Sequence, residues 1–191
     1  MDAGLAAVLG ATVGAVGTGG AGIVAALLAR SQARSQLHAE HARIIREPRR
    51  AAYVAFTEVA LKDHNRLSEI VNLLETSATH PNYGEAGLET ARQQHEAVRA
   101  NSPERDHRYA QVVVEGPRTV TDQATTHRVA FADFVSESLD CLHQFERSGN
   151  CPPDAIRSVQ EKRSECYGSI LDFLYAAQRA IGADGINQPP E

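Results

Sequence analysis

Hydrophobic residues recur every three or four positions through three long segments, which cover residues 49–76, 118–146 and 154–182. This spacing places the hydrophobic side chains on one face of an α-helix and leaves the remaining faces polar. The three stripes comprise Tyr53, Phe56, Val59, Ala60, Leu67, Ile70, Val71 and Leu74; Val120, Ala124, Phe131, Phe134, Val135, Leu139, Leu142 and Phe145; and Ile156, Val159, Cys166, Ile170, Phe173, Leu174, Ala177 and Ile181. The pattern predicts three long amphipathic helices that each bury one face.

The sequence between the first two of these helices predicts a loop and a further, shorter helix. Residues 77–85 contain Pro, Asn and Gly and predict the loop, and residues 86–101 are only weakly amphipathic. The sequence SPE at residues 102–104 is typical of a helix start. Residues 109–115 include three consecutive valines that suit either a strand or a helix, and we favour a helix because no partner strand is evident.

Proline and glycine mark where these helices begin and end. Pro48 interrupts the helix-forming segment before it, and Gly116 and Gly149 stand at the ends of helical stretches. Residues 183–191 have the composition of a flexible tail. Together these signals predict an all-α fold in which residues 49–182 form an antiparallel helical bundle of three to four helices.

The N-terminal segment has a different character from the bundle. Residues 3–29 carry no charge and consist of nine Leu, Val or Ile, nine Ala, seven Gly and two Thr. As a helix they extend about 40 Å, enough to cross a hydrocarbon core of about 30 Å. Seven glycines disfavour such a helix in water, whereas in lipid the backbone must pair internally and a helix forms despite glycine. Residues 1–29 are therefore predicted to be a transmembrane anchor, and the chain to be a single-pass membrane protein.

Two other interpretations of this segment fit the sequence less well. Gly17, Gly19 and Gly22 form the G-x-G-x-x-G pattern of a dinucleotide-binding turn, but that site needs a second strand about 20 residues later. The corresponding sequence, residues 33–47, is charged and helix-forming instead. A cleaved signal peptide is the second alternative, although its start should be basic and its apolar region 7–15 residues long.

Small residues within the anchor follow a spacing of four. Gly10, Gly14, Thr18 and Gly22 belong to this row. Rows of this kind let transmembrane helices pack closely, so the anchor is a candidate for homo-oligomer formation. The alternative is chance, because small residues make up most of the segment.

Arginine is concentrated directly after the anchor. Residues 30–50 contain only two acidic residues and six arginines, namely Arg30, Arg34, Arg43, Arg46, Arg49 and Arg50. The positive-inside rule then predicts an N-terminus outside the cell, a basic juxtamembrane helix over residues 30–48 and a cytoplasmic C-terminal domain. The same arginines are expected to contact anionic lipid head groups at the membrane surface. The net charge of −5 makes the remainder acidic, which argues against nucleic acid as a partner.

The sequence holds no recognisable catalytic, cofactor or metal constellation. The three cysteines are an odd number without framework spacing, which suggests reduced thiols in the cytosol, with Cys166 in the core. A zinc site built from Cys141, His143 and the other cysteines is disfavoured, since Cys141 and His143 diverge on a helix. Glu104 and His107 resemble half of a di-iron motif without a second copy. His127 falls on an apolar face and is expected to be a core histidine.

These observations favour a non-enzymatic function. The expected function is a protein-interaction or scaffold module at the cytoplasmic face of the membrane, with membrane lipid and an unidentified protein as partners and with no cofactor. The alternative is a small membrane-active effector or assembly factor that oligomerises through the glycine-rich helix.

Three segments resemble a known group of proteins. They are REPRRAAYVAF at residues 46–56, YAQVVVEGPRTV at residues 109–120 and DFLYAAQRAIG at residues 172–182. Their pattern is similar to that of small actinobacterial proteins in which an apolar N-terminal helix leads through an Arg-rich segment into a helical domain. The resemblance implies this architecture for the bacterial chain and, because the group has no assigned activity, implies no chemistry.

Overall fold

A computed structural model describes residues 30, 32, 36, 40, 43, 44, 46–77 and 84–183. The chain divides into two compact units, Met1–Ile45 and Arg46–Glu191, and the fold below is that of the second. The predicted anchor, with Gly10, Gly14, Thr18 and Gly22, lies outside the described residues. Among the residues described, no helix is both long and apolar enough to cross a membrane.

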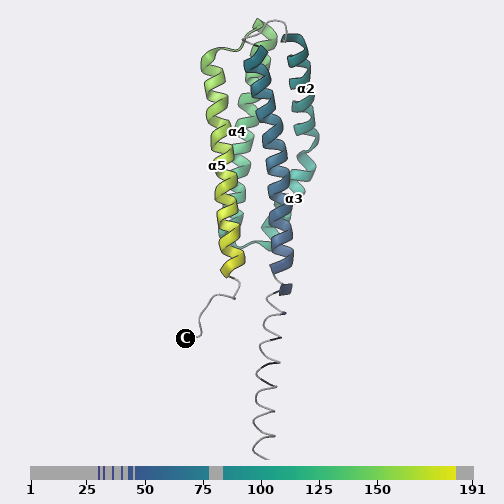
Figure 1. The fold of residues 1–191 in the computed structure, drawn as a ribbon, viewed down its shortest axis with the longest axis vertical. Helices are drawn as coiled ribbons and strands as arrows, with labels where there is room; N and C mark the ends of the chain where they lie inside the picture. Colours follow the sequence, from purple (N-terminus) through teal and green to yellow (C-terminus); the bar gives the residue numbers. More distant parts are fainter. Residues whose placement is uncertain are drawn as a thin grey trace, which may run out of the picture. The chain divides into compact units, whose positions relative to one another are not determined.

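The second unit is a bundle of antiparallel helices (Figure 1). Residues 46–77 are helical and are followed by α2 (Gly84–Ala100), α3 (Ser102–Glu115), α4 (Arg118–Ser148) and α5 (Pro153–Ala183). The helix at residues 46–77, hereafter the first helix, runs in the direction opposite to α2 and α3, which follow one another along the same side of the bundle (Figure 1). Helices α4 and α5 complete it as a long hairpin.

The predicted all-α fold is confirmed, since the described residues contain no strand. The predicted number of three to four helices is too low: the described residues of the second unit form five, because residues 84–100 form a helix of their own. Their pattern is weak because α2 contributes mainly small side chains to the core, Ala91 and Val98. Residues 109–115 belong to α3, so the helical alternative was correct for this segment.

The turn between α4 and α5 is built from a glycine and a disulfide. Gly149 has φ 69° and ends α4 in the left-handed conformation, in which a side chain would clash with the backbone. Cys141 and Cys151 are bonded across the turn, with Cα atoms 6.1 Å apart. The expectation of three reduced thiols is therefore wrong for this pair. The turn brings Cys151 back against Cys141, which is buried on α4.

The core of the bundle is divided into two hydrophobic clusters. The larger lies toward the α4–α5 turn and is built around Leu67, Ile70, Phe134, Leu142 and Phe145. The smaller lies toward the opposite end and is built around Tyr53, Phe56, Val112, Val120 and Phe173. Between the two clusters, polar side chains from the first helix, the α2–α3 junction, α3, α4 and α5 enter the interior of the bundle.

Candidate functional site: a buried polar layer and its cavity

Six side chains form a polar layer between the two hydrophobic clusters. The first helix contributes Asp63 and His64, the α2–α3 junction and α3 contribute Asn101 and Arg105, α4 contributes His127, and α5 contributes Ser169. Asp63, His64, His127 and Ser169 are all less than one tenth exposed. Burying polar groups is costly unless they find partners, so their contacts show what holds the layer together.

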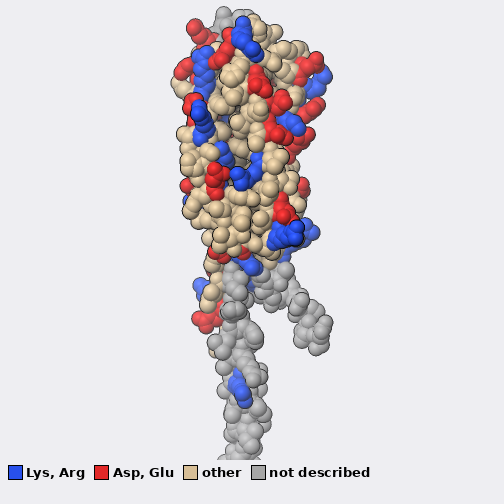
Figure 2. All heavy atoms as spheres, turned by 180° about the vertical axis from the view of Figure 1, so that it is seen from behind, with Lys and Arg blue, Asp and Glu red and all other residues tan. Residues whose placement is uncertain are grey.

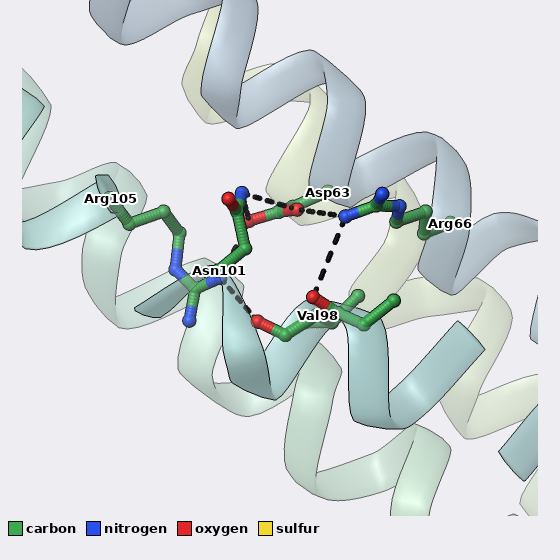
Figure 3. A network of polar contacts seen from close by, with 6 residues as sticks. Asp63, Arg66, Val98, Asn101 and Arg105 are labelled. Carbon is green, nitrogen blue, oxygen red and sulfur yellow. Dashed lines mark hydrogen bonds and ion pairs between the residues drawn. The ribbon is translucent and has the colours of Figure 1, made fainter. Parts of the chain in front are cut away.

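Asp63 is the charge at the centre of this layer and is fully buried. The Asn101 side-chain amide Nδ2 lies 2.9 Å from both carboxylate oxygens and donates to them. Arg105 donates from Nη1 to Oδ2 at 2.5 Å, and Arg66 Nη1 lies 3.5 Å from Oδ1 (Figure 3). Two guanidinium groups and one amide therefore compensate a single carboxylate that has no access to water.

The break between α2 and α3 supplies these donors. Asn101 precedes α3 at its N-cap position but makes no side-chain cap, and its amide Nδ2 donates to Asp63. Pro103 has no backbone N–H, so the helix cannot continue through this point with a complete set of hydrogen bonds. Arg105 Nη1 also donates to the carbonyl oxygen of Val98 at 2.9 Å, which satisfies a carbonyl of the last turn of α2.

His127 is held in one tautomer by its neighbours. The Ser169 hydroxyl donates to the carbonyl oxygen of Cys166 at 2.7 Å, so it must accept in its 2.9 Å contact with His127 Nδ1. The ring proton is therefore on Nδ1, and Nε2 carries a free lone pair. Burial lowers the pKa of His127 to about 4, and the nearby His64 and Arg105 act in the same direction. The imidazole is thus neutral at neutral pH.

His64 lies between aromatic rings on the other side of the layer. Its ring centroid is 5.6 Å from that of Phe134 and 5.5 Å from that of Tyr167. Its Nε2 is 3.4 Å from the Ser68 hydroxyl, while its buried Nδ1 has no partner among the described residues. Burial, and secondarily the charge of Arg163, lower the pKa of His64.

A cavity of about 340 Å³ opens beside the layer, between the first helix, α3 and α4. Its polar lining consists of Ser102, Arg105, Asp106, His127 and Arg128. Its apolar lining consists of Phe56, Val59, Ala60, Phe131, Ala132 and Val135. The volume lies within the range of small-molecule sites, which combine apolar walls with a few convergent polar groups.

Two arginines stand at this cavity in fixed positions. The Arg105 guanidinium carbon lies 4.7 Å from the centroid of the Phe131 ring. Arg128 lies 4.3 Å from the Tyr109 ring centroid, and its Nη2 is 3.4 Å from Asp106 Oδ1. Each guanidinium is thus oriented by an aromatic face and a carboxylate.

The six arginines predicted to lie at the membrane surface have different environments. Arg30, Arg43 and Arg50 are exposed, Arg46 and Arg49 are half-buried, and the side chain of Arg34 is outside the described residues. Arg49 Nε donates to the carbonyl oxygen of Glu115 at 2.8 Å, at the end of α3. Arg49 therefore contributes to the packing of the bundle and differs from the exposed arginines.

The other residues singled out from the sequence have the following environments. His127 and Cys166 are buried as expected, and burial raises the pKa of the Cys166 thiol to about 12. Glu104 pairs with Arg108 at 2.7 Å. Within the described part of the chain, no three His, Cys, Asp or Glu side chains are grouped to hold a metal ion.

Sequence analysis missed Asp63, Asn101, Arg105 and Ser169. A signal was present for the first of these, because the apolar stripe of the first helix skips from Ala60 to Leu67. Helical periodicity requires a buried residue at position 63 or 64, and both are polar. The remaining three gave no comparable signal, since their roles depend on which helix faces meet.

Replacing Asp63 by Ala is expected to destabilise the protein by about 3–5 kcal/mol, because Arg105 then remains buried without its partner. The double variant D63L/R105L should lose less than the sum of the two single variants, because it removes both charges. Urea unfolding of the detergent-solubilised chain measures this, with the exposed Glu69→Ala as the control. Additive losses in the double variant would contradict the assigned pairing.

Stability is expected to fall as the pH is lowered from about 6.5 to about 4. His127 has a folded-state pKa of about 4, below its unfolded value, so the unfolded chain binds more protons throughout this window. The loss should reach about 3 kcal/mol from this residue. His64 contributes in the same direction.

The variant H127N tests this assignment, because the Asn amide can still donate to Ser169 but does not titrate. Urea midpoints measured at several pH values should depend less on pH in H127N than in the wild type. The exposed His107→Asn should retain the wild-type profile. An unchanged slope in H127N would show that other groups cause the acid sensitivity.

No family model, curated protein or solved structure matches this chain.

Proposed function

We propose that the chain is a single-pass membrane protein whose helical domain is an interaction module that pairs with a second copy of itself. The observation that carries this proposal is an exposed apolar stripe on α5. Tyr167 is 47% exposed, Leu171 37% and Leu174 39%, although all three are large hydrophobic side chains. Contiguous apolar surface of this kind is typical of an interaction site.

The stripe continues into a groove between α5 and the first helix. The groove has a volume of about 380 Å³ and is lined mainly by apolar side chains, among them Val54, Leu61, Leu174, Ala177 and Ile181. The only charged side chains that line it are Arg50 and Glu58. An apolar helix face therefore fits this groove better than a charged segment does.

The spacing of the stripe favours a second copy as its occupant. Tyr167, Leu171, Leu174, Gln178 and Ile181 are separated by four, three, four and three residues, which is the a/d repeat of a coiled-coil seam. Two copies that offer the same face to each other form a closed, two-fold interface. Anchors in one membrane would hold the copies parallel and raise their effective concentration. The row of Gly10, Gly14, Thr18 and Gly22 would extend the contact into the bilayer.

The exposed arginines support a position close to the membrane, whereas the rest of the surface gives no support for nucleic acid binding. On the face shown in Figure 2, acidic and basic side chains are interspersed and form no continuous basic field. Arg30, Arg43 and Arg50, in contrast, are exposed and precede or begin the bundle. Anionic lipid head groups are the partner proposed for them.

Two features bear on which side of the membrane the domain faces. The six arginines that follow the anchor favour the cytoplasm. The Cys141–Cys151 disulfide points the other way, because disulfides persist mainly in oxidising compartments. We place the domain in the cytoplasm, because the arginine distribution acts during insertion and because the burial of both cysteines shields their disulfide from reductants there.

The double variant L171E/L174E is expected to abolish pairing, because it places two carboxylates in the seam. Energy transfer between fluorescent-protein fusions of the full chain in lipid vesicles measures this. Val114→Glu is the matched control, since Val114 is 80% exposed but lies on α3, away from the groove. Transfer that persists in L171E/L174E would refute pairing through α5. If energy transfer persists in L171E/L174E but is lost in G10L/G14L, the alternative of an effector that oligomerises through its anchor is favoured.

The proposed anchor predicts that the chain resists extraction from membranes by an alkaline wash. The cytoplasmic placement predicts that a reporter fused to the C-terminus is active only inside the cell. Release of the protein from the membrane by this wash would refute the transmembrane anchor. A C-terminal reporter active only outside the cell would place the domain on the exported side.

A further inference from the structure

The cavity beside the polar layer has the features of a built ligand site that the proposed pairing does not use. It lies between the first helix, α3 and α4, whereas the pairing groove lies between the first helix and α5. Its most informative member is His127, which is only 3% exposed and yet lines the cavity. The site can therefore be tested independently of the proposed function.

The free nitrogen of His127 specifies one feature of the ligand. Ser169 fixes the proton on Nδ1, and Nε2 accepts no hydrogen bond from the described residues. His127 lines the cavity and its Nδ1 is engaged by Ser169, so Nε2 is the ring nitrogen left for a ligand. A neutral imidazole nitrogen of this kind accepts a hydrogen bond, and a group that fills the cavity must offer a hydroxyl or an N–H to match it.

The charges at the cavity specify a second feature. Arg105 and Arg128 line it together with a single carboxylate, Asp106. Arg66 and Arg105 both pair with the buried Asp63, and Arg128 pairs with Asp106, so three guanidinium groups stand against two carboxylates here. Arg128 remains half exposed although it pairs with Asp106. The excess of guanidinium groups favours an anionic ligand, and guanidinium matches a carboxylate in geometry as well as in charge.

The apolar walls specify the third feature. Phe56 and Phe131 both lie against the His127 ring, at centroid distances of 5.8 and 6.1 Å. Val59 and Val135 complete the wall. Such a wall suits an aromatic ring or a short aliphatic body, and about 340 Å³ limits the ligand to a small molecule.

We propose that this cavity binds a small organic acid with an aromatic or short aliphatic body and one hydroxyl or N–H group. The carboxylate pairs with Arg105 and Arg128, the body packs between Phe56 and Phe131, and the hydroxyl or N–H donates to Nε2 of His127.

Three related probes test the two polar contacts on the unmodified protein. They are 4-hydroxyphenylacetate, 4-methoxyphenylacetate, which lacks the donor, and 4-hydroxyphenylacetamide, which lacks the charge. Titration calorimetry of the full chain in detergent at pH 7.5 should show binding of the hydroxy acid and about tenfold weaker binding of each analogue. Failure of the hydroxy acid to bind, or equal binding of the methoxy acid, would overturn the proposal.

Matched variants then assign the contacts to residues. H127N keeps a donor for Ser169 but removes Nε2, so it should bind the hydroxy and methoxy acids equally. H127Q places an amide oxygen near the position of Nε2, so it should keep the preference for the hydroxy acid. R128Q should lose the preference for the acid over the amide, whereas R118Q, at an arginine that is 94% exposed on α4, should not. Discrimination that survives in both H127N and R128Q would place the probe elsewhere and refute the assignment.

Discussion

The carboxylate of Asp63 has no exposed surface and depends entirely on groups from other parts of the chain for its compensation. Asn101 and Arg105 follow it by 38 and 42 residues, so both must arrive at the same level of the bundle for the charge to be tolerated. Sliding α2 and α3 by one turn against the first helix would leave Asp63 facing hydrophobic side chains. Leaving a buried charge unpaired costs several kcal/mol, which is comparable to the net stability of a small domain. The polar layer therefore penalises alternative registers that the two hydrophobic clusters alone would accept.

The same constraint explains why one side of the bundle consists of two helices. An uninterrupted helix over residues 84–115 would present Asn101 as an ordinary helix-interior residue. The junction with Pro103 instead frees the carbonyl of Val98, which Arg105 Nη1 reaches together with Asp63. Arg105 thus links the junction, the buried carboxylate and the Phe131 ring of α4. One side chain thus joins its own helix α3 to three other helices, and it also forms part of the cavity wall.

The sequence alone predicted most of the helices but little of this layer. Periodic stripes and the glycines at 116 and 149 located α3, α4 and α5 closely, because a helix end is a local property of the chain. The separate helix α2 was underestimated, because Ala91 and Val98 bury little area and give a weak stripe. The Cys141–Cys151 pairing and the contacts of Asp63 are properties of tertiary structure. Periodicity shows which face of each helix is buried, but it does not show which buried faces meet. The polar interruption at residues 63 and 64 was visible in the sequence, and only the folded bundle shows what satisfies it.

The chemistry of the buried groups favours recognition over catalysis at this site. His127, with a pKa of about 4, stays neutral at neutral pH and is poorly matched to proton transfer there. The Asp63 carboxylate already accepts from Asn101 and Arg105, so few of its lone pairs remain to take a proton from a substrate. Burial raises the pKa of the Cys166 thiol to about 12, which leaves almost none of it as the reactive thiolate. What these groups do offer is fixed hydrogen-bonding geometry: a bare imidazole nitrogen, two oriented guanidinium groups and an aromatic wall around one small cavity. Because these side chains are already ordered, ligand binding does not carry the entropic cost of fixing them. This property is expected of a recognition site.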